Sequence, residues 1–301
     1  MRIAVVGGGP AGLSCAAVAA ERGHQVTLFE KSGELGGQFN LAKVIPGKQE
    51  FAESIAYYAE RLRRAGVDVR LNASPGKEEL ARYDSVVLAT GIEPRRPGIA
   101  GIDHPKVASY VDVLAGRVRP GRNVAIIGMG GIGFDVALYL LEGGSRAPLD
   151  PEAFREHWGI SNEGKIIAAT EKAPAHRITM LKRSHTPFGH TLGRTTGWVH
   201  RAELARNGVR MLKGVAYERI DDHGLHVVHE GQKLLVKADT IVVCAVTAPD
   251  GQSCLIQQKR GWTRRSFHRS RYPSAVAGWR LGRDNELVQF APRAAARESR
   301  S

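Results

Sequence analysis

Short apolar runs alternate with helical stretches along most of the chain. Residues 2–6 form a β-branched run, a glycine-rich turn follows them, and the small residues 13–21 recur at helical spacing. A second apolar run, residues 25–30, ends in an acid, as expected of the next parallel strand in a βαβ unit. Residues 1–30 therefore predict strand, tight turn, helix and strand, in the order of a dinucleotide-binding fold.

The same pattern returns after a proline-rich stretch. Residues 48–65 predict an amphipathic helix and residues 83–89 a buried strand, after which Pro94 and Pro97 are typical of a crossing between domains. Residues 123–127 then predict a strand, followed by a second glycine-rich turn and a helix. Further elements are predicted at residues 67–71 (strand), 134–141 (helix), 177–181 (strand), 198–206 (helix), and 209–212, 215–220, 224–229, 234–236 and 240–245 (strands).

These elements predict an α/β fold with two Rossmann-like dinucleotide-binding domains in a three-layer architecture. The polar residues 143–176 read as an insertion with one short helix near residues 154–158. We do not expect residues 1–20 to be a signal peptide, because four glycines interrupt them and charged residues follow. With no apolar run of about 18 residues, we expect no membrane segment and a cytoplasmic protein.

The charge of the chain is concentrated near its C-terminus. The whole chain has a net charge of +13, and residues 246–301 carry +7 of it, without a sustained apolar period. A solvated, poorly ordered tail explains this composition better than a nucleic-acid-binding function does. The three cysteines form no CxxC motif, which argues against a structural zinc, an iron-sulfur cluster held by this chain alone, or a redox dithiol.

The first glycine-rich turn has the spacing of a pyrophosphate-binding loop. Gly7, Gly9 and Gly12 suit a tight turn, a close approach of the backbone to phosphate, and close packing of helix on strand. Glu30 ends the next strand about 20 residues later, where a carboxylate accepts hydrogen bonds from ribose hydroxyls. The alternative is a glycine-rich turn with a surface acid.

The second turn repeats this fingerprint with a different strand end. Gly128, Gly130 and Gly133 have the same spacing, but the following strand ends in Lys182 and Arg183 rather than in an acid. Basic groups there favour the 2′-phosphate of NADP, although a solvated strand end would look the same. Two such loops predict one site for FAD and one for a nicotinamide cofactor. The histidines show no partner pattern, and no catalytic residue is predicted.

Four stretches carry a resemblance to a known family: LGGQFNLAKVIPGKQEF (35–51), LATGIEPRRPGIAGIDHPKVASYVDVL (88–114), VAIIGMGGIGFD (124–135) and LGRTTGWVHR (192–201). They closely resemble the C-terminal half of bacterial NADPH-dependent 2,4-dienoyl-CoA reductases, of which trimethylamine dehydrogenase is a more distant relative. The resemblance implies that hydride passes from NADPH to FAD in this half. Electrons would then pass through a 4Fe-4S cluster to FMN. Both groups would be held by a barrel domain or separate subunit that this chain does not contain. The process that the resemblance implies is fatty acid β-oxidation.

The resemblance also assigns cofactor-binding positions to each loop region. On the FAD side they are Gly7, Gly9, Pro10, Ala11, Gly12, Glu30, Lys31, Gly37, Gln38, Thr90 and Gly91. On the NADPH side they are Gly128, Gly130, Gly131, Ile132, Gly133, Lys182 and Arg183. The expected domains are an FAD-binding domain at 1–112 with an altered C-terminal part, an NADPH-binding domain at 113–245, and the basic tail at 246–301.

The chain departs from the family after residue 245. The family continues with a glycine-rich segment whose acid helps to hold the flavin, whereas here the sequence becomes VTAPDGQSCLIQQKRGWTRRSFHRS, as a shift of reading frame would produce. An inactive fragment, or a structural module that holds ADP or NADP without turnover, is therefore an alternative, and only hydride transfer distinguishes it from an enzyme. A stand-alone disulfide reductase conflicts with the missing CxxC motif, and nucleic-acid binding rests on the tail alone.

Overall fold

The computed structural model describes residues 1–142, 145, 147–168, 173–190, 192–193 and 195–245, and the backbone of three short strands further along the chain. It divides into two compact units. The first unit takes Met1–Gln38, Ser54–Gly91 and Pro249–Ser301, and the second takes Phe39–Glu53 and Ile92–Ala248. The chain thus passes from the first unit to the second at residue 39 and returns to the first unit after residue 53.

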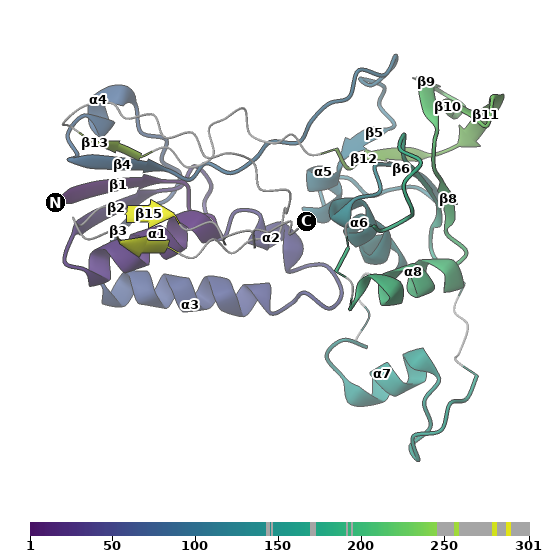
Figure 1. Cartoon of the computed structure of the whole chain (residues 1–301), viewed down its shortest axis with the longest axis horizontal. Helices are drawn as coiled ribbons and strands as arrows, with labels where there is room; N and C mark the ends of the chain where they lie inside the picture. Colours follow the sequence, from purple (N-terminus) through teal and green to yellow (C-terminus); the bar gives the residue numbers. More distant parts are fainter. Residues whose placement is uncertain are drawn as a thin grey trace, which may run out of the picture. The chain divides into compact units, whose positions relative to one another are not determined.

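The first unit is a five-stranded sheet with the strand order β13-β4-β1-β2-β3. The strands β1 (Arg2–Val6), β2 (Gln25–Phe29), β3 (Asp68–Arg70) and β4 (Ser85–Leu88) pair in parallel, whereas β13 (Ile256–Gln258) is antiparallel to β4. Helix α1 (Pro10–Glu21) connects β1 to β2, and α3 (Phe51–Arg64) precedes β3 (Figure 1). The short helix α4 (Lys77–Leu80) precedes β4.

Both faces of this sheet are buried, as is usual for parallel strands. Ile3 and Val5 of β1 pack with Leu13 of α1 and Leu62 of α3. Ala4, which points to the opposite face, joins a second cluster of buried residues with neighbours from β2 and β4. Burial on both faces explains why these strands read as continuous apolar runs in the sequence.

The second unit has three layers around another parallel sheet. Its strand order is β5-β12-β6-β7-β8. The strands are β5 (Val107–Ser109), β6 (Asn123–Ile127), β7 (Arg177–Leu181), β8 (Arg210–Leu212) and β12 (Thr240–Val243). Helices α5 (Tyr110–Leu114), α6 (Gly131–Glu142) and α8 (Gly197–Arg206) contribute residues to the core on one face. The antiparallel strands β9 (Ala216–Asp221), β10 (Gly224–His229) and β11 (Gln232–Lys237) cover the other face.

Alternation along β6 builds both of these cores. Val124 and Ile126 pack toward the helices, and Ala125 and Ile127 pack toward the antiparallel strands. Every second residue of a strand points to the same face, so one apolar run of five residues supplies both layers. The α/β class with two Rossmann-like units, predicted from the sequence, is confirmed.

The structure also shows elements that the pattern did not predict. Helices α2 (Phe39–Ala42), α4 and α5 and strand β5 are short, and the last two lie in the stretch interpreted as a crossing between domains. Helices α1 and α6 begin at Pro10 and Gly131, three residues before their predicted starts at residues 13 and 134. The reason is that part of each glycine-rich turn is already helical.

The insertion contains the predicted short helix. Helix α7 (Pro151–Trp158) begins at Asp150, whose carboxylate accepts hydrogen bonds from the amides of Glu152 (2.9 Å) and Ala153 (3.1 Å). It ends at Gly159, which adopts a left-handed conformation with φ +63°. In Figure 1, α7 lies beyond α8 on the side away from the strands of the second unit.

The tail is described only at β13, β14 (Trp279–Leu281) and β15 (Leu287–Gln289), the last two of which pair antiparallel. The expected poor order of residues 246–301 otherwise falls outside the described residues. The domain limits 1–112 and 113–245 remain predictions about cofactor binding, and the compact units divide at Gly91 and Ile92.

Candidate functional site: two glycine-rich loops

The first glycine-rich loop closes tightly on neighbouring backbone. Gly7 has φ +112°, and a side-chain Cβ at this position would lie 2.2 Å from the carbonyl oxygen of Ala89. A Cβ at Gly12 would lie 1.8 Å from the carbonyl oxygen of Gly7. These two positions tolerate only glycine, because strand β1, helix α1 and the end of β4 approach one another there.

The middle glycine of this loop has a different role. A Cβ at Gly9 would be 4.0 Å from its nearest neighbour, the Cα of Gly37, so Gly9 is not demanded by internal packing. Gly9 precedes α1 without a side-chain cap, and Pro10 occupies the first turn. Backbone amides at the start of α1 therefore remain available to an anion, as a pyrophosphate requires.

Glu30 connects this loop to the one after β2. It is 7% exposed, and its Oε2 accepts a hydrogen bond from the amide of Gly8 at 2.6 Å. Its Oε1 accepts from the amide and from the hydroxyl of Ser32, each at 2.8 Å. Each carboxylate oxygen can accept more than one hydrogen bond, so these contacts leave capacity for a ribose hydroxyl. That ribose contact stays a prediction.

The other positions assigned to the FAD side are accessible. Pro10 is half-buried, and the remaining ones are exposed: Ala11, Lys31, Gly37, Gln38, Thr90 and Gly91. Thr90 and Gly91 follow β4, which is adjacent to β1, so they lie at the carboxyl ends of these parallel strands. Ligands of open α/β sheets bind at this edge.

The second loop repeats this division of roles. Gly128 has φ +111°, and a Cβ there would be 3.0 Å from the carbonyl oxygen of Cys244; one at Gly133 would be 2.1 Å from the carbonyl oxygen of Gly128. In contrast, a Cβ at Gly130 or Gly131 would meet nothing within 4 Å. The outer glycines are required by packing, and the middle ones leave the start of α6 open. Ile132 is partly buried against the core of the second unit.

The two basic residues predicted to select NADP differ in their surroundings. Lys182 is 8% exposed, and its Nζ donates hydrogen bonds to Thr186 Oγ1 (3.0 Å) and to the carbonyl oxygen of Pro187 (2.9 Å). Burial, and then the nearby Lys213, lower the pKa of Lys182. Arg183 is exposed. The ammonium group of Lys182 is thus engaged in hydrogen bonds within the protein, and Arg183 is the more accessible cation.

Lys213 is a candidate that the sequence pattern did not single out. It is exposed and follows β8, next to β7 in the sheet. The Nζ atoms of Lys182 and Lys213 lie 5.5 Å and 5.9 Å from the centre of the Phe188 ring. Two lysines from neighbouring strand ends therefore share one aromatic ring. Only the order of strands in the sheet, which the sequence does not state, brings them together.

A second missed feature lies on the first turns of α6. Asp135 Oδ1 forms an ion pair with Lys48 Nζ at 2.7 Å. The pKa of the half-buried His200 of α8 depends on both groups. Burial lowers this pKa, the charge of Asp135 opposes that effect, and the charge of Lys48 adds to it. Burial also raises the pKa of the Cys244 thiol, with a smaller contribution from Asp135. Lys48, Asp135 and His200 all lie in stretches that carry the family resemblance, which was the available signal.

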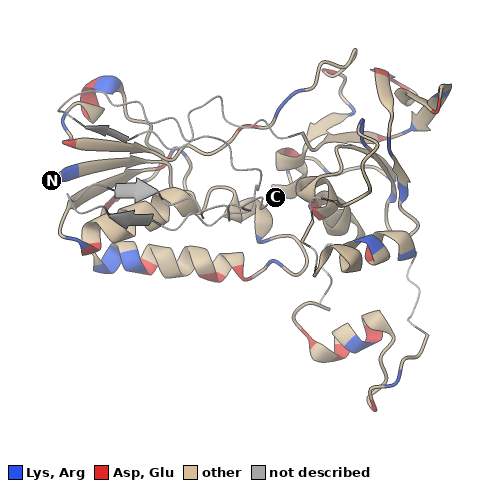
Figure 2. Cartoon of the chain, viewed as in Figure 1, with Lys and Arg blue, Asp and Glu red and all other residues tan. Residues whose placement is uncertain are grey.

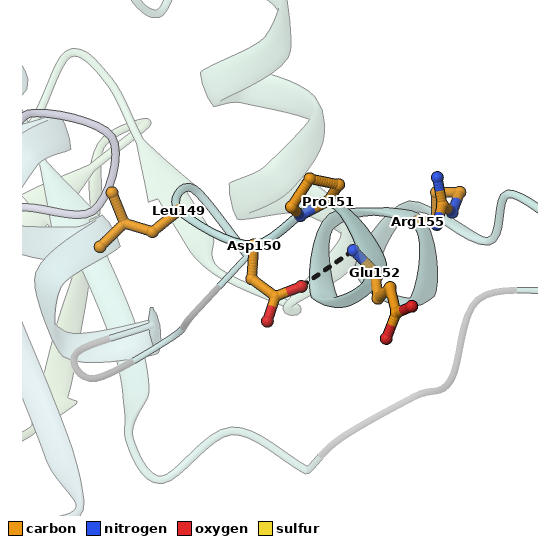
Figure 3. A pocket seen from close by; sticks show the side chains of 5 residues that line it. All are labelled: Leu149, Asp150, Pro151, Glu152 and Arg155. Atoms are coloured by element: carbon orange, nitrogen blue, oxygen red, sulfur yellow. Dashed lines mark hydrogen bonds between the residues drawn. The ribbon is translucent and has the colours of Figure 1, made fainter.

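Two other features of the described residues do not belong to these loops. A hollow at the start of α7, lined by Leu149, Asp150, Pro151, Glu152 and Arg155, contains no residue of either loop (Figure 3). Of its two carboxylates, Asp150 is occupied with capping the helix. Cys15 and Cys244 are buried and form no disulfide, so neither provides an exposed thiol pair.

The three arginines of helix α3 are paired with acids. Figure 2 shows acidic and basic segments side by side on α3. There Arg61 pairs with Glu21 at 2.6 Å, and both Arg63 and Arg64 pair with Glu60, at 2.8 Å and 2.7 Å. This helix therefore does not present unpaired arginines of the kind that bind phosphate backbones.

The chain belongs to the pyridine nucleotide-disulphide oxidoreductase family, whose model matches residues 1–261. This is a family of oxidoreductases that bind FAD and NAD(P)H, and the geometry of both loops fits such dinucleotides: packed outer glycines, an open middle position, and a free helix start. The match and the two Rossmann-like units define the class of protein.

Among its relatives is a metal reductase of Desulforamulus reducens, 34% identical over 254 residues, which cover 80% of this chain and 37% of the relative. An NADH oxidase of Thermoanaerobacter brockii is 41% identical over 154 residues, or 49% of this chain and 24% of that protein. A solved structure of a 2-naphthoyl-CoA reductase complex superposes with a TM-score of 0.68 and 28% identity, over 82% of this chain and 33% of that one.

The chain thus spans about a quarter to two fifths of the length of these relatives. The activities of the whole relatives belong to proteins that contain more than the part matched here. Among the described residues, no helix combines the length and apolar character that crossing a membrane requires.

Proposed function

We propose that this chain binds FAD in its first unit and NADPH in its second and passes hydride from NADPH to FAD. It would be the electron-input module of a 2,4-dienoyl-CoA reductase-like flavoenzyme. The observation that carries the proposal is the duplicated loop. In each unit, a Cβ added at an outer glycine would lie 3.0 Å or less from a backbone oxygen, whereas one at the middle glycine would meet open space or only a distant Cα. Structural turns do not need that open position, whereas pyrophosphate binding does.

In the first unit, the loop would bind the pyrophosphate of FAD through the amides at the start of α1. Glu30 holds the loop by its hydrogen bond to Gly8 and presents its remaining lone pairs to a ribose. Bound flavin supplies a two-electron acceptor, a chemistry that the described side chains lack. The task of the protein residues is therefore to bind and orient.

In the second unit, Arg183 and Lys213 would pair with the 2′-phosphate of NADPH. Both are exposed and follow adjacent parallel strands, and a phosphate between them would gain two charge-assisted hydrogen bonds. Lys182 supports them indirectly, because its bonds to Thr186 and Pro187 fix the loop that carries Phe188. NADPH is thereby proposed over NADH.

The Lys48–Asp135 pair would position the start of α6 relative to the segment of residues 39–53. Asp135 lies two residues after Gly133, and Lys48 comes from the segment that follows Gly37 and Gln38 in the chain. Because the ion pair is partly shielded from water, it restrains both elements more than a surface pair would. Its proposed role is orientation of the bound nicotinamide cofactor.

The same proposal includes a further domain or subunit that accepts the electrons. The matched relatives are about three to four times as long as the part that this chain covers. A barrel domain or subunit with FMN and a 4Fe-4S cluster would receive the electrons. The absence of a CxxC motif in the sequence fits a chain that holds no such cluster by itself.

The deciding experiment is an anaerobic titration of the purified chain, reconstituted with FAD, with NADPH. Loss of the flavin absorbance at about 450 nm would support hydride transfer within the chain. NADPH binding without bleaching of bound flavin would instead identify a nucleotide-holding module. The Gly130→Ala variant provides the matched control, because its added methyl group has space in the fold but obstructs the pyrophosphate.

A further inference from the structure

Four ionisable side chains from three helices of the second unit meet away from both glycine loops. They are Glu142 at the end of α6, His157 on α7, and Glu203 and Arg206 on α8; we call them the α7 cluster. Ligand atoms of Glu142, His157 and Glu203 all lie within 4.8 Å of one another, and Glu203 is 4% exposed. Two carboxyl groups held this close away from water require a proton or a cation between them.

Arg206 joins the last turn of α7 to α8. Its Nη1 donates to the carbonyl oxygen of His157 at 2.6 Å, and its Nη2 lies 3.2 Å from Glu203 Oε1 and 3.0 Å from His157 Nε2. The guanidinium also lies over the Trp158 ring, 5.3 Å from its centre. A single arginine thus contacts backbone, imidazole and indole of the same helix while neutralising one buried carboxylate.

The second carboxyl group is held differently. A carboxylate oxygen of Glu142 lies within 4.8 Å of one of Glu203, and a hydrogen bond between two carboxyl groups needs a proton on one of them. Burial first, and then the hydrogen bond and charge of Glu203, raise the pKa of Glu142 to about 7, against the opposing charge of Arg206. The groups that face Glu142 are therefore Glu203 and Arg206 from α8 and His157 from α7.

A divalent cation is the other means of balancing two close carboxylates. Here the guanidinium of Arg206 already lies within hydrogen-bond distance of both Glu203 and His157, so positive charge is present without a metal. One shared proton completes the balance of charge in the α7 cluster, which favours a proton over a metal ion.

We propose that the Glu142–Glu203 carboxyl pair is a proton-operated attachment of helix α7 to the second unit. With one proton shared, Glu142 needs no further partner, and Arg206 holds His157 and Trp158. When that proton leaves to solvent, two adjacent carboxylates compete for Arg206, and its contacts with α7 weaken. The insertion is then attached at mildly acidic pH and loosened at mildly alkaline pH, a property separate from hydride transfer.

The test is amide hydrogen exchange of the intact chain at about pH 6 and about pH 8, corrected for the intrinsic pH dependence of exchange. Since the carboxyl group would return to an ordinary pKa on release, the protection of residues 151–158 should fall by up to about tenfold between these pH values. Peptides from residues 54–64 of α3, which lie in the first unit, should not change in parallel. Equal protection of α7 at both pH values in the wild type overturns the proposal without any variant.

Two variants distinguish an effect of the α7 cluster on the protection of α7 from an effect of the overall charge of that helix. Glu142→Gln keeps a hydrogen-bond donor but cannot ionise, so its α7 protection should be high and independent of pH. Glu156→Gln removes an exposed charge from the same helix and should retain the wild-type pH dependence. A Glu142→Gln protein that loses protection at pH 8 as the wild type does would contradict the mechanism.

Zinc distinguishes a metal site from a proton site. Excess Zn²⁺ at about pH 8 should leave the exchange of α7 unchanged if the cluster is balanced by a proton. Protection restored by Zn²⁺ in the wild type, but not in His157→Gln, would show that the α7 cluster binds a metal ion, and the proposal would be wrong.

Discussion

Lys48 Nζ lies 2.7 Å from Asp135 Oδ1, joining residues 87 positions apart in the sequence. Neither side chain is fully exposed: Lys48 retains 33% and Asp135 19% of its accessible surface. The pair joins the segment of residues 39–53 to the helix that begins at the second glycine-rich loop. His200, whose pKa responds to both charges, provides a means of testing this arrangement.

Removing the charge of Lys48 and removing the charge of Asp135 should shift the pKa of His200 in opposite directions. Lys48→Met removes a cation that disfavours the imidazolium, so the His200 pKa should rise, whereas Asp135→Asn should lower it further. An NMR titration of the histidine ring protons measures both shifts. Stability should change by only about 1 kcal/mol or less, because the pair is partly solvated. Shifts in the same direction for both variants would contradict the geometry.

The glycines of the second loop should separate folding from binding. Gly133→Ala places a Cβ 2.1 Å from a backbone oxygen and should destabilise the protein by several kcal/mol, measured by urea unfolding. Gly130→Ala should unfold within about 0.5 kcal/mol of the wild type and yet bind NADPH at least about tenfold more weakly. Normal NADPH binding by Gly130→Ala would argue against a pyrophosphate at this loop.

Arg183→Gln and Lys213→Gln should change cofactor choice. Loss of one charge-assisted hydrogen bond to a phosphate costs about 1.5–3 kcal/mol, so the Kd for NADPH should rise about tenfold or more in each variant. The Kd for NADH, which lacks the 2′-phosphate, should stay nearly constant. The matched control is Arg210→Gln, an exposed arginine at the start of β8 and thus at the opposite end of that strand. Equal losses for NADPH and NADH would indicate a general effect on folding.

Glu30→Gln should loosen the first loop. The carboxylate accepts from the Gly8 amide and from both donors of Ser32, and an amide side chain can offer only one oxygen to these donors. The expected cost is about 1–3 kcal/mol of unfolding free energy, together with weaker retention of FAD. Ser32→Ala, which removes one of the three hydrogen bonds, should lie between this variant and the wild type. Unchanged FAD retention in Glu30→Gln would show that the loop does not depend on this residue.

Much of the fold could be predicted because its signals are local. The apolar runs at β1, β6 and β7 coincide with the predicted strands, since strands buried on both faces leave a continuous run. Short elements such as β5 and α5 were missed, because three to five residues are too few to show a period.

The candidate site was predictable only in part. Glycine spacing located both loops, because their tight backbone conformation requires glycine at the same positions of each loop. It did not show that Lys182 turns inward to Thr186 and Pro187, nor that Lys213 lies beside the same aromatic ring. The position of Lys213 depends on which strands are neighbours in the sheet, and the contacts of Lys182 depend on how the loop after β7 folds back on it.

By itself, the sequence determined two Rossmann-like units, because periodicity and glycine-rich turns act within a few residues along the chain. Only the tertiary structure decided which distant charges meet: Lys48 with Asp135, and Glu142 with His157, Glu203 and Arg206. The physical reason is that such pairs arise from the packing of helices on sheets. No local pattern encodes the relative position of elements that are far apart in the chain.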